Sequence, residues 1–426
     1  MPSWVSEDTY DVLTLLRGLL GPDGFIHPNL RFAFSGGAGR GLFAARPLRR
    51  DEVLLQVPLK KILRKGSLAW SEAPGFKGSR KGLAEDEEII VYLAALRKYG
   101  LYSEWYRYIR SLPQDPPNST VSWRPEEVAA LQGTPAHAPA RALRRQLLRL
   151  CQRYVSWLTC EELRWASSLY WSRANTIALH PSTSSSVRSF HALLPAVDLL
   201  NFDAGSTNYF RMAGSSLVYI AGSDMAAGDE VLDNYGGGKN DTYLLAHYGF
   251  LHQDEAESYV SLGPLPLRPD GHRKLKKRIL LSQPSDSLEL KLRPGGDVEG
   301  ASLLRLGLTV PEELSALTVQ ALLARSPLPA ERFVRSELDS MTWLHNACDD
   351  GLRLLMRHNS SVDGLCDGTV KVLIGEYRAR TARLWEDCVQ VPQTVTEQRR
   401  EKLRREERKL PPPRQLAESS SPVPSD

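Results

Sequence analysis

The stretch of sequence that decides the fold runs through residues 193–250. It begins with LLPAVDLLNFD (193–203) and ends with GDEVLDNYGGGKNDTYLLAHYGF (228–250). Residues 216–235, which run into the second motif, alternate apolar and polar side chains clearly enough for a β-hairpin, with Ala227-Gly228-Asp229 at its turn. We therefore expect short strands from about Leu194 to Phe250.

Polar and aromatic side chains punctuate both motifs. Asp198 and Asn201 are embedded in an otherwise apolar run. Because buried Asp and Asn side chains must be hydrogen-bonded, these two are either structural turn-formers or contacts to a ligand. Tyr235 and Tyr248 each precede a glycine, and tyrosines in β-rich folds most often serve in packing. Taken singly, each of these residues has a structural explanation as well as a functional one.

A glycine-rich segment, GGAGRGLF (36–43), lies upstream between strand-like pieces. Glycines let the backbone approach a ligand closely and present N–H groups to polar or anionic atoms. The segment lacks the lysine of a phosphate-binding loop, and no helix follows it to make a dinucleotide site. A plain β-turn explains it equally well when it is considered alone.

Arg173 follows a long helical region in the run Trp171-Ser172-Arg173-Ala174-Asn175. An arginine at the edge of a pocket can hold a carboxylate through paired hydrogen bonds. The alternative is a solvent-exposed arginine at the end of a helix.

Helical periodicity frames the β-rich region. Residues 9–20 and about 85–171 have helical apolar spacing, residues 30–63 alternate short apolar runs with turn signals, and helical segments resume beyond about 253. The predicted organisation is an N-terminal helix (1–26), a β-rich domain with a helical insert (27–252, insert about 85–171), a helical C-terminal lobe (253–395) and a charged, disordered tail (396–426).

Composition excludes several classes of protein. The chain has 426 residues, 42% of them hydrophobic and 24% charged, which is typical of an ordinary globular protein with two to three domains. No run approaches about 18 consecutive apolar residues, and the acidic N-terminus has no basic leader, so we expect neither a membrane span nor a signal peptide. A net charge of +4 is too small and dispersed to indicate a nucleic-acid partner.

The five cysteines are sparse and include no C-x-x-C pair. They are Cys151, Cys160, Cys348, Cys366 and Cys388. We expect buried free thiols in a reducing compartment, and neither a disulfide framework nor a zinc cluster. The predicted location is therefore intracellular, in the cytoplasm, the nucleus or both.

Together the motifs resemble those of SET-domain protein methyltransferases. The matching segments are Gly39-Arg40-Gly41-Leu42-Phe43, Ser172-Arg173, Asp198-x-x-Asn201 and Tyr235-Gly236…Asn240…Tyr248-Gly249-Phe250. More closely, the chain is similar to the branch that contains the RuBisCO large-subunit and actin-histidine methyltransferases, over about residues 27–395. That resemblance implies an α+β fold: a β-rich SET fold with a helical insert, followed by an all-α substrate-binding lobe.

The resemblance also implies an activity, which is methyl transfer from S-adenosylmethionine to a protein lysine without a metal. The cofactor-binding positions that it implies are Gly39, Arg40, Gly41, Arg173, Asn201, Phe202, Tyr235 and Tyr248. Arg173 is expected near the cofactor carboxylate and Asn201 at its amino group. Tyr235, beside the channel through which the methyl passes, is implied as the catalytic residue, and Asp198 as a substrate contact.

These residue types suit the implied reaction. Methyl transfer from a sulfonium is an in-line displacement, so alignment can supply most of the acceleration. The lysine must be neutral to have a lone pair, and an apolar channel beside a positive sulfonium lowers its pKa. A tyrosine hydroxyl can orient the amine without acting as a strong base. The expected partner is a lysine-bearing protein, which need not be a histone, and the expected enzyme is a monomer.

Phe202 departs from the family pattern, which has Asn-His where this chain has Asn201-Phe202. If the histidine acts through its backbone, phenylalanine preserves that contact. If its imidazole fixes a neighbour, that neighbour loses about 1–3 kcal/mol when it is left buried and unpaired. Phe202 therefore leaves open one alternative, a catalytically impaired SET-like binding module, and a protein-histidine methyltransferase stays open as a second alternative.

Overall fold

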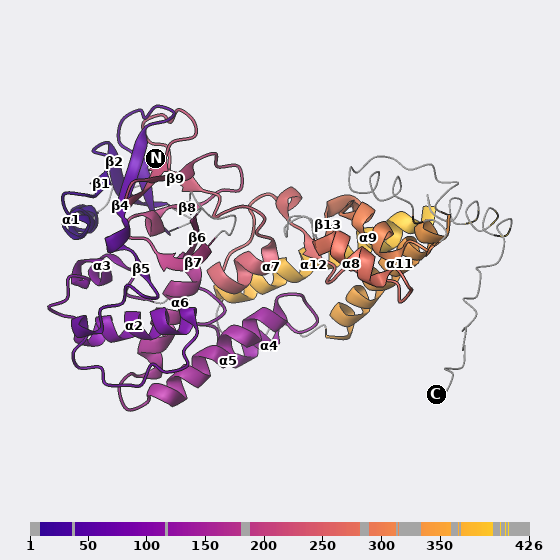
Figure 1. Cartoon of the computed structure of the whole chain (residues 1–426), viewed down its shortest axis with the longest axis horizontal. Helices are drawn as coiled ribbons and strands as arrows, with labels where there is room; N and C mark the ends of the chain where they lie inside the picture. The colour runs from indigo at the N-terminus through magenta and orange to yellow at the C-terminus, as the bar shows by residue number, and fades with distance from the viewer. Residues whose placement is uncertain are drawn as a thin grey trace, which may run out of the picture. The chain divides into compact units, whose positions relative to one another are not determined.

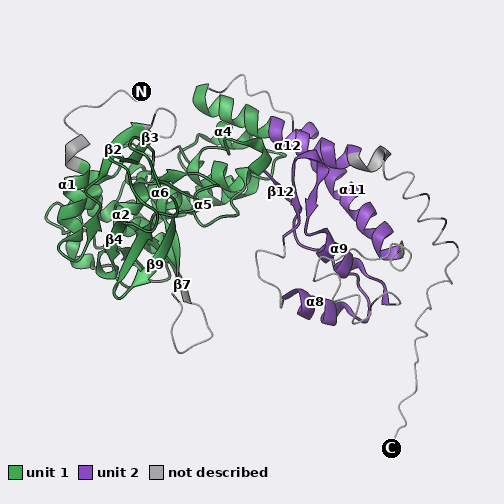
Figure 2. Ribbon diagram, turned by 90° about the horizontal axis from the view of Figure 1, so that it is seen from above, with its two compact units in different colours: residues 1–257, 360–378 green, residues 258–359, 379–426 purple. Residues whose placement is uncertain are grey.

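The computed structural model describes residues 9–35, 39–115, 118–179, 188–281, 289–311, 334–358 and 368–394, with single residues at 314, 365, 401, 405 and 408. The chain divides into two compact units, residues 1–257 with 360–378 and residues 258–359 with 379–426 (Figure 2). Both contain helices and strands, so the predicted α+β class is confirmed (Figure 1). The predicted tail, 396–426, lies outside the described residues except at 401, 405 and 408.

Small antiparallel sheets form the β-rich part of unit 1. One has the order β1 (Phe25–Ile26), β4 (Val53–Pro58), β10 (Ser216–Ile220) and β9 (Tyr209–Ala213), and a second joins β5 (Leu63–Arg64), β7 (Arg188–Leu193) and β6 (Asn175–Leu179). The glycine-rich segment lies on a third, the hairpin of β2 (Leu30–Ser35) and β3 (Gly39–Ala44).

Helices pack beside these sheets as the periodicity predicts. They are α1 (Thr9–Leu20), α2 (Glu85–Tyr99), α3 (Tyr106–Ser111), α4 (Pro125–Ala129), α5 (His137–Tyr154) and α6 (Cys160–Arg173). α6 begins at a capping box, in which the Thr159 hydroxyl accepts from the Glu162 N–H at 3.1 Å and the Glu162 carboxylate accepts from the Thr159 N–H at 2.7 Å. It ends at Arg173.

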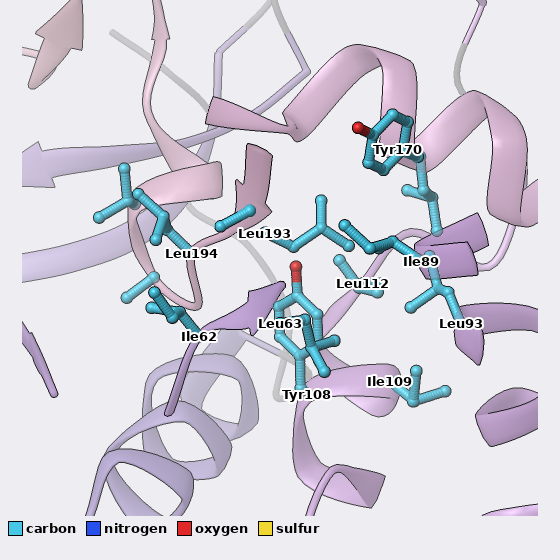
Figure 3. Close-up of a cluster of buried hydrophobic side chains, with 14 of the residues drawn as sticks. Ile62, Leu63, Ile89, Leu93, Tyr108, Ile109, Leu112, Tyr170, Leu193 and Leu194 are labelled. Carbon is cyan, nitrogen blue, oxygen red and sulfur yellow. The ribbon is translucent and has the colours of Figure 1, made fainter. Parts of the chain in front are cut away.

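The core of unit 1 holds the helical insert against the sheets. Every residue from Ile89 to Leu96 of α2 is buried. Figure 3 shows Ile89 and Leu93 of α2 in one apolar cluster with Tyr108 of α3 and Tyr170 of α6. Since burying a large aliphatic side chain contributes about 1.5–3 kcal/mol, this cluster fixes the end of α6 and the side chain of Tyr108 relative to the strands.

One local expectation is wrong. Residues 241–248 were expected to be strand-like, but they form α7 (Asp241–Tyr243) and a π-helical turn (Leu244–Tyr248). The cause is a cap: the Asn240 side chain accepts from the Tyr243 N–H at 2.9 Å and so starts a helix.

Unit 2 contains α8 (Arg273–Leu281), α9 (Ala301–Leu308) and α11 (Val334–Arg357), while α12 (Gly368–Thr394) contributes to both units. It also contains a three-stranded sheet of β12 (Val260–Ser261), β13 (Lys291–Leu292) and β14 (Val298–Glu299), which the all-helical expectation omitted. Strands of two residues are too short to produce a periodic signal.

The cysteine prediction is wrong for four of the five residues. Cys151 pairs with Cys160 across the α5–α6 connection, and Cys348 pairs with Cys388 between α11 and α12, at Cα separations of 4.9 and 6.0 Å. Both separations lie in the range that disulfides require. Helix pairing, which spacing in the sequence does not reveal, brings these cysteines together, so the cysteine content no longer argues for a reducing compartment. Cys366 lies outside the described residues.

Among the helices that the structure describes, none combines the length and apolar character needed to span a membrane. No group of three or more His, Cys, Asp or Glu side chains in the described ranges is arranged to hold a metal ion.

Candidate active site

Segments distant in the sequence meet in a parallel strand pair. β8 (Asn201–Phe202) pairs with β11 (Leu232–Asp233) in the register Leu232↔Asn201. The Val231 N–H donates to the Leu42 carbonyl at 2.8 Å, which joins β3 to the same place. The two sequence motifs and the glycine-rich strand therefore lie together.

Gly41 lies in close contact with two polar side chains. A Cβ at this position would stand 2.4 Å from Glu230 Oε1 and 3.0 Å from Asn201 Nδ2, so any larger residue would displace the Glu230 carboxylate. Asn201 Nδ2 donates to Glu230 Oε1 at 2.6 Å and to the Arg40 carbonyl at 3.2 Å. Because both neighbours are acceptors, the amide orientation is fixed, and Oδ1 is left without a partner in the described part of the chain. Gly39, by contrast, has open space where a Cβ would stand.

Two arginines, Arg40 and Arg173, lie within electrostatic reach of the Asp198 carboxylate. Tyr108 Oη donates to Asp198 Oδ2 at 2.6 Å. Burial raises the pKa of Asp198, and Arg173 and the Tyr108 hydrogen bond oppose this rise. Burial and the nearby charge of Arg173 lower the pKa of Arg40 to about 10, while Asp198 acts in the other direction. The two guanidinium groups therefore carry one positive charge more than Asp198 balances.

Tyr235 has a left-handed backbone, with φ of 53°, and three glycines with positive φ follow it. Its hydroxyl donates to the Leu200 carbonyl at 2.9 Å. Burial raises the pKa of the Tyr235 phenol, and Arg173 acts in the opposite direction, which places that guanidinium within electrostatic reach of the ring. A non-glycine residue at positive φ is held there by its surroundings.

Tyr248 stacks on Tyr235, with ring centroids 4.9 Å apart and 23° between the planes. It ends the π-helical turn, and Gly249 follows with φ of 76°. A Cβ at Gly249 would stand 1.4 Å from the Asn118 carbonyl oxygen. The hydroxyl of Tyr248 forms no hydrogen bond with a described residue, unlike that of Tyr235.

Phe202 joins this aromatic group. Its ring centroid lies 5.3 Å from that of Tyr235, 5.7 Å from Phe250 and 5.4 Å from His252. Buried polar atoms without a partner do occur in the described residues, but none belongs to these three neighbours. Phenylalanine at this position therefore leaves no orphaned group around it.

Sequence reasoning did not select three residues that the structure brings to the site. Tyr108 binds Asp198, and Glu230 binds Asn201. Lys239 Nζ donates to the Tyr235 carbonyl and lies 5.3 Å from the Tyr243 ring centroid. Burial lowers the pKa of Lys239, and Asp233 opposes this effect. Only the glycines before Lys239 hinted at an unusual turn, and Glu230 carries no sequence signal of its own.

Relatives of known activity match about half of the chain. It is 28% identical to an actin-histidine N-methyltransferase of Drosophila melanogaster over 272 residues, which cover 56% of this chain and 49% of the relative. It is 26% identical to a chloroplastic [fructose-bisphosphate aldolase]-lysine N-methyltransferase of Arabidopsis thaliana over 252 residues, covering 53% and 48%. The chain thus spans about half the length of the curated relatives that it matches. No family model matches the sequence.

Solved structures match nearly the whole chain. RuBisCO LSMT bound to AdoMet superimposes with a TM-score of 0.62 at 18% identity and 94% coverage of both chains. The SET domain of LSMT bound to lysine and AdoHcy gives a TM-score of 0.61, also at 18% identity, and covers 97% of this chain and 98% of that one. The chain therefore has the fold of these SET-domain structures, and about half of it is similar in sequence to protein methyltransferases that include the RuBisCO large-subunit enzymes.

Proposed function

We propose that this protein is an S-adenosylmethionine-dependent protein N-methyltransferase whose acceptor is a lysine. The observation that carries the proposal is the convergence, in one place, of an excess positive charge, a free amide oxygen and a stacked tyrosine pair. These are supplied by Arg40 with Arg173, by Asn201, and by Tyr235 with Tyr248.

The residues present fit the cofactor. Its amino-acid end carries a carboxylate, and Arg40 and Arg173 have one positive charge that Asp198 does not balance. Its amino group needs acceptors, and Asn201 Oδ1 is available. The missing Cβ of Gly41 keeps the backbone of β3 close to the Asn201 amide nitrogen. Gly39, Arg40, Gly41, Arg173, Asn201, Phe202, Tyr235 and Tyr248 are the proposed cofactor-binding residues.

The bound cofactor supplies an electrophilic methyl group on a sulfonium. The chain must then present a neutral amine in line, away from water. The surroundings of Tyr235 already disfavour an ammonium, since burial lowers the pKa of Lys239 beside it. An acceptor lysine in the same aromatic surroundings would lose its proton more readily for the same reason.

The two tyrosines have different roles in this proposal. Tyr235 donates to the Leu200 carbonyl, so its hydroxyl is fixed and its ring orients the site. Tyr248 keeps a hydroxyl without a partner in the described residues, which leaves it to contact the amine directly. Asp198, expected to contact the substrate, has its carboxylate bound to Tyr108. We propose that Asp198 acts on the substrate indirectly, by holding the arginine pair.

The experiment is methyl transfer from labelled S-adenosylmethionine to proteins of a cell extract. Tyr248→Phe should lower the rate at least about 100-fold, and Tyr235→Phe by a smaller factor. Tyr102, which is 98% exposed, provides the matched control, and Tyr102→Phe should change nothing. Mass spectrometry of the labelled peptide separates a lysine acceptor from a histidine acceptor. A folded wild-type protein that labels no protein would overturn the proposal in favour of the binding-module alternative.

A further inference from the structure

Glu230 is a half-buried carboxylate without a counter-charge. It lies one residue before Val231, whose N–H bonds to Leu42 of β3, and its own backbone forms an isolated bridge with Phe43. In the described part of the chain it forms no ion pair, although a half-buried charge is ordinarily paired. In the described part of the chain its carboxylate accepts one hydrogen bond, from Asn201 Nδ2 to Oε1 at 2.6 Å.

Two acceptor oxygens converge on the Asn201 amide nitrogen. Asn201 Nδ2 holds Glu230 Oε1 and the Arg40 carbonyl, at 2.6 and 3.2 Å. The second oxygen of the Glu230 carboxylate and Asn201 Oδ1 have no partner among the described residues, and a carbonyl oxygen has a second lone pair. A protonated primary amine has three N–H groups and one positive charge. The set therefore matches it in the number of acceptors and in charge.

We propose that Glu230 binds the protonated amino group of the cofactor, as the negative counterpart of the arginine pair. Rather than serving only to orient Asn201, Glu230 gives the site its selectivity for a zwitterionic amino-acid end. Arg40 connects the two halves, since its carbonyl faces Asn201 and its side chain lies in the electrostatic field of Arg173 and Asp198. This inference rests on the proposed function, because it takes S-adenosylmethionine as the ligand.

The test is calorimetric binding of two ligands, S-adenosylhomocysteine and its analogue without the α-amino group. Glu230→Gln removes the charge and keeps an oxygen for Asn201. It should weaken S-adenosylhomocysteine about five- to tenfold, as expected for a partly screened charge pair, and change the analogue less than about twofold. Asp229→Asn is the matched control: it removes one charge from the exposed neighbouring residue, whose carboxylate accepts from the Ala226 N–H, and it should alter neither affinity.

The possible outcomes separate the two proposals. If Glu230→Gln binds S-adenosylhomocysteine as wild type does while Glu230→Ala binds it weakly, Glu230 serves only as a hydrogen-bond acceptor and the charge assignment is wrong. If Glu230→Gln weakens both ligands equally, the effect is structural and the assignment is again wrong. If wild type binds S-adenosylhomocysteine normally in those cases, the proposed function survives. A folded wild type that binds neither ligand overturns both.

Discussion

Replacing Gly249 with alanine tests whether the turn that carries Tyr248 is held by its contact with the Asn118 backbone. The Cβ would stand 1.4 Å from the Asn118 oxygen, whereas ordinary contact begins at 3.4 Å. The turn or the facing loop must therefore move by 2.0 Å, the difference between these values. Such a movement breaks two bonds to the Ala246 carbonyl, from the Thr120 N–H at 3.2 Å and from its hydroxyl at 2.8 Å.

The magnitude follows from these contacts. The left-handed φ of 76° costs an alanine about 1 kcal/mol. The two lost hydrogen bonds contribute about 1 kcal/mol each, so the free energy of unfolding should fall by about 3 kcal/mol. Gly237 offers a matched control, because its φ is 69° and a Cβ there has nothing within 4 Å. Gly237→Ala should therefore lose only the backbone part, about 1 kcal/mol.

Urea titration of wild type and both variants, followed by circular dichroism, measures this difference. Methyl transfer is measured alongside it, and Gly249→Ala should lose about 100-fold in rate, since a misplacement of about 1 Å in a catalytic group is that costly. Equal losses of unfolding free energy in the two variants would refute the reasoning, because backbone strain alone would then explain both.

Three further predictions concern neighbours of the tyrosine pair. Burial lowers the pKa of His247 from 6.5 to about 4, although its bond to the Tyr243 carbonyl opposes this. Below pH 6.5 the unfolded chain takes up a proton that the folded chain does not, so the free energy of unfolding is at its full value above pH 6.5 and falls between pH 6.5 and 4. At about 1.4 kcal/mol per pH unit, reduced for solvent screening, the free energy of unfolding should fall by about 1–2 kcal/mol. Urea titrations of wild type at a series of pH values should show this fall, and the same titrations of His247→Gln should not. Lys239→Met should lower the free energy of unfolding by about 1 kcal/mol and slow methyl transfer, because the Tyr235 carbonyl loses its donor. Lys239→Arg should keep wild-type stability and rate, and identical behaviour of the two variants in urea titration and in the methyl-transfer assay would contradict this. Phe202→His should destabilise the protein by about 1–3 kcal/mol, since the imidazole enters a group of rings, and unchanged thermal unfolding would count against that packing argument.

The sequence predicted the elements whose signals are long or chemically distinctive. Helical periodicity anticipated α2 and α6, of which α6 begins at an ordinary capping box and α2 buries a continuous apolar run. The motifs around Asn201 and Tyr235 anticipated the region where β8 meets β11. Neither periodicity nor spacing could reveal Tyr108, because its role depends on helix α3 reaching Asp198 from 90 positions away. The helix at 241–248 was missed because the apolar run LLAHY outweighed the single cap at Asn240.

The effect of Phe202 depends on what surrounds it more than on the histidine it replaces. A lost imidazole is costly only where a buried partner is left without a hydrogen bond. The rings that contact Phe202 belong to Tyr235, Phe250 and His252, and among the described residues none of these has a buried orphan atom. His252 itself bonds to the Lys239 carbonyl at 2.7 Å, so it closes the turn that follows Tyr235. Phenylalanine in place of histidine at position 202 therefore changes only the polarity of this aromatic group. The charged and hydrogen-bonding groups proposed to bind the cofactor belong to Arg40, Arg173, Asn201 and Glu230. Among the described residues, the hydrogen bonds of Asn201 and Glu230 do not involve the Phe202 ring, so we expect cofactor binding to survive the substitution that distinguishes this chain.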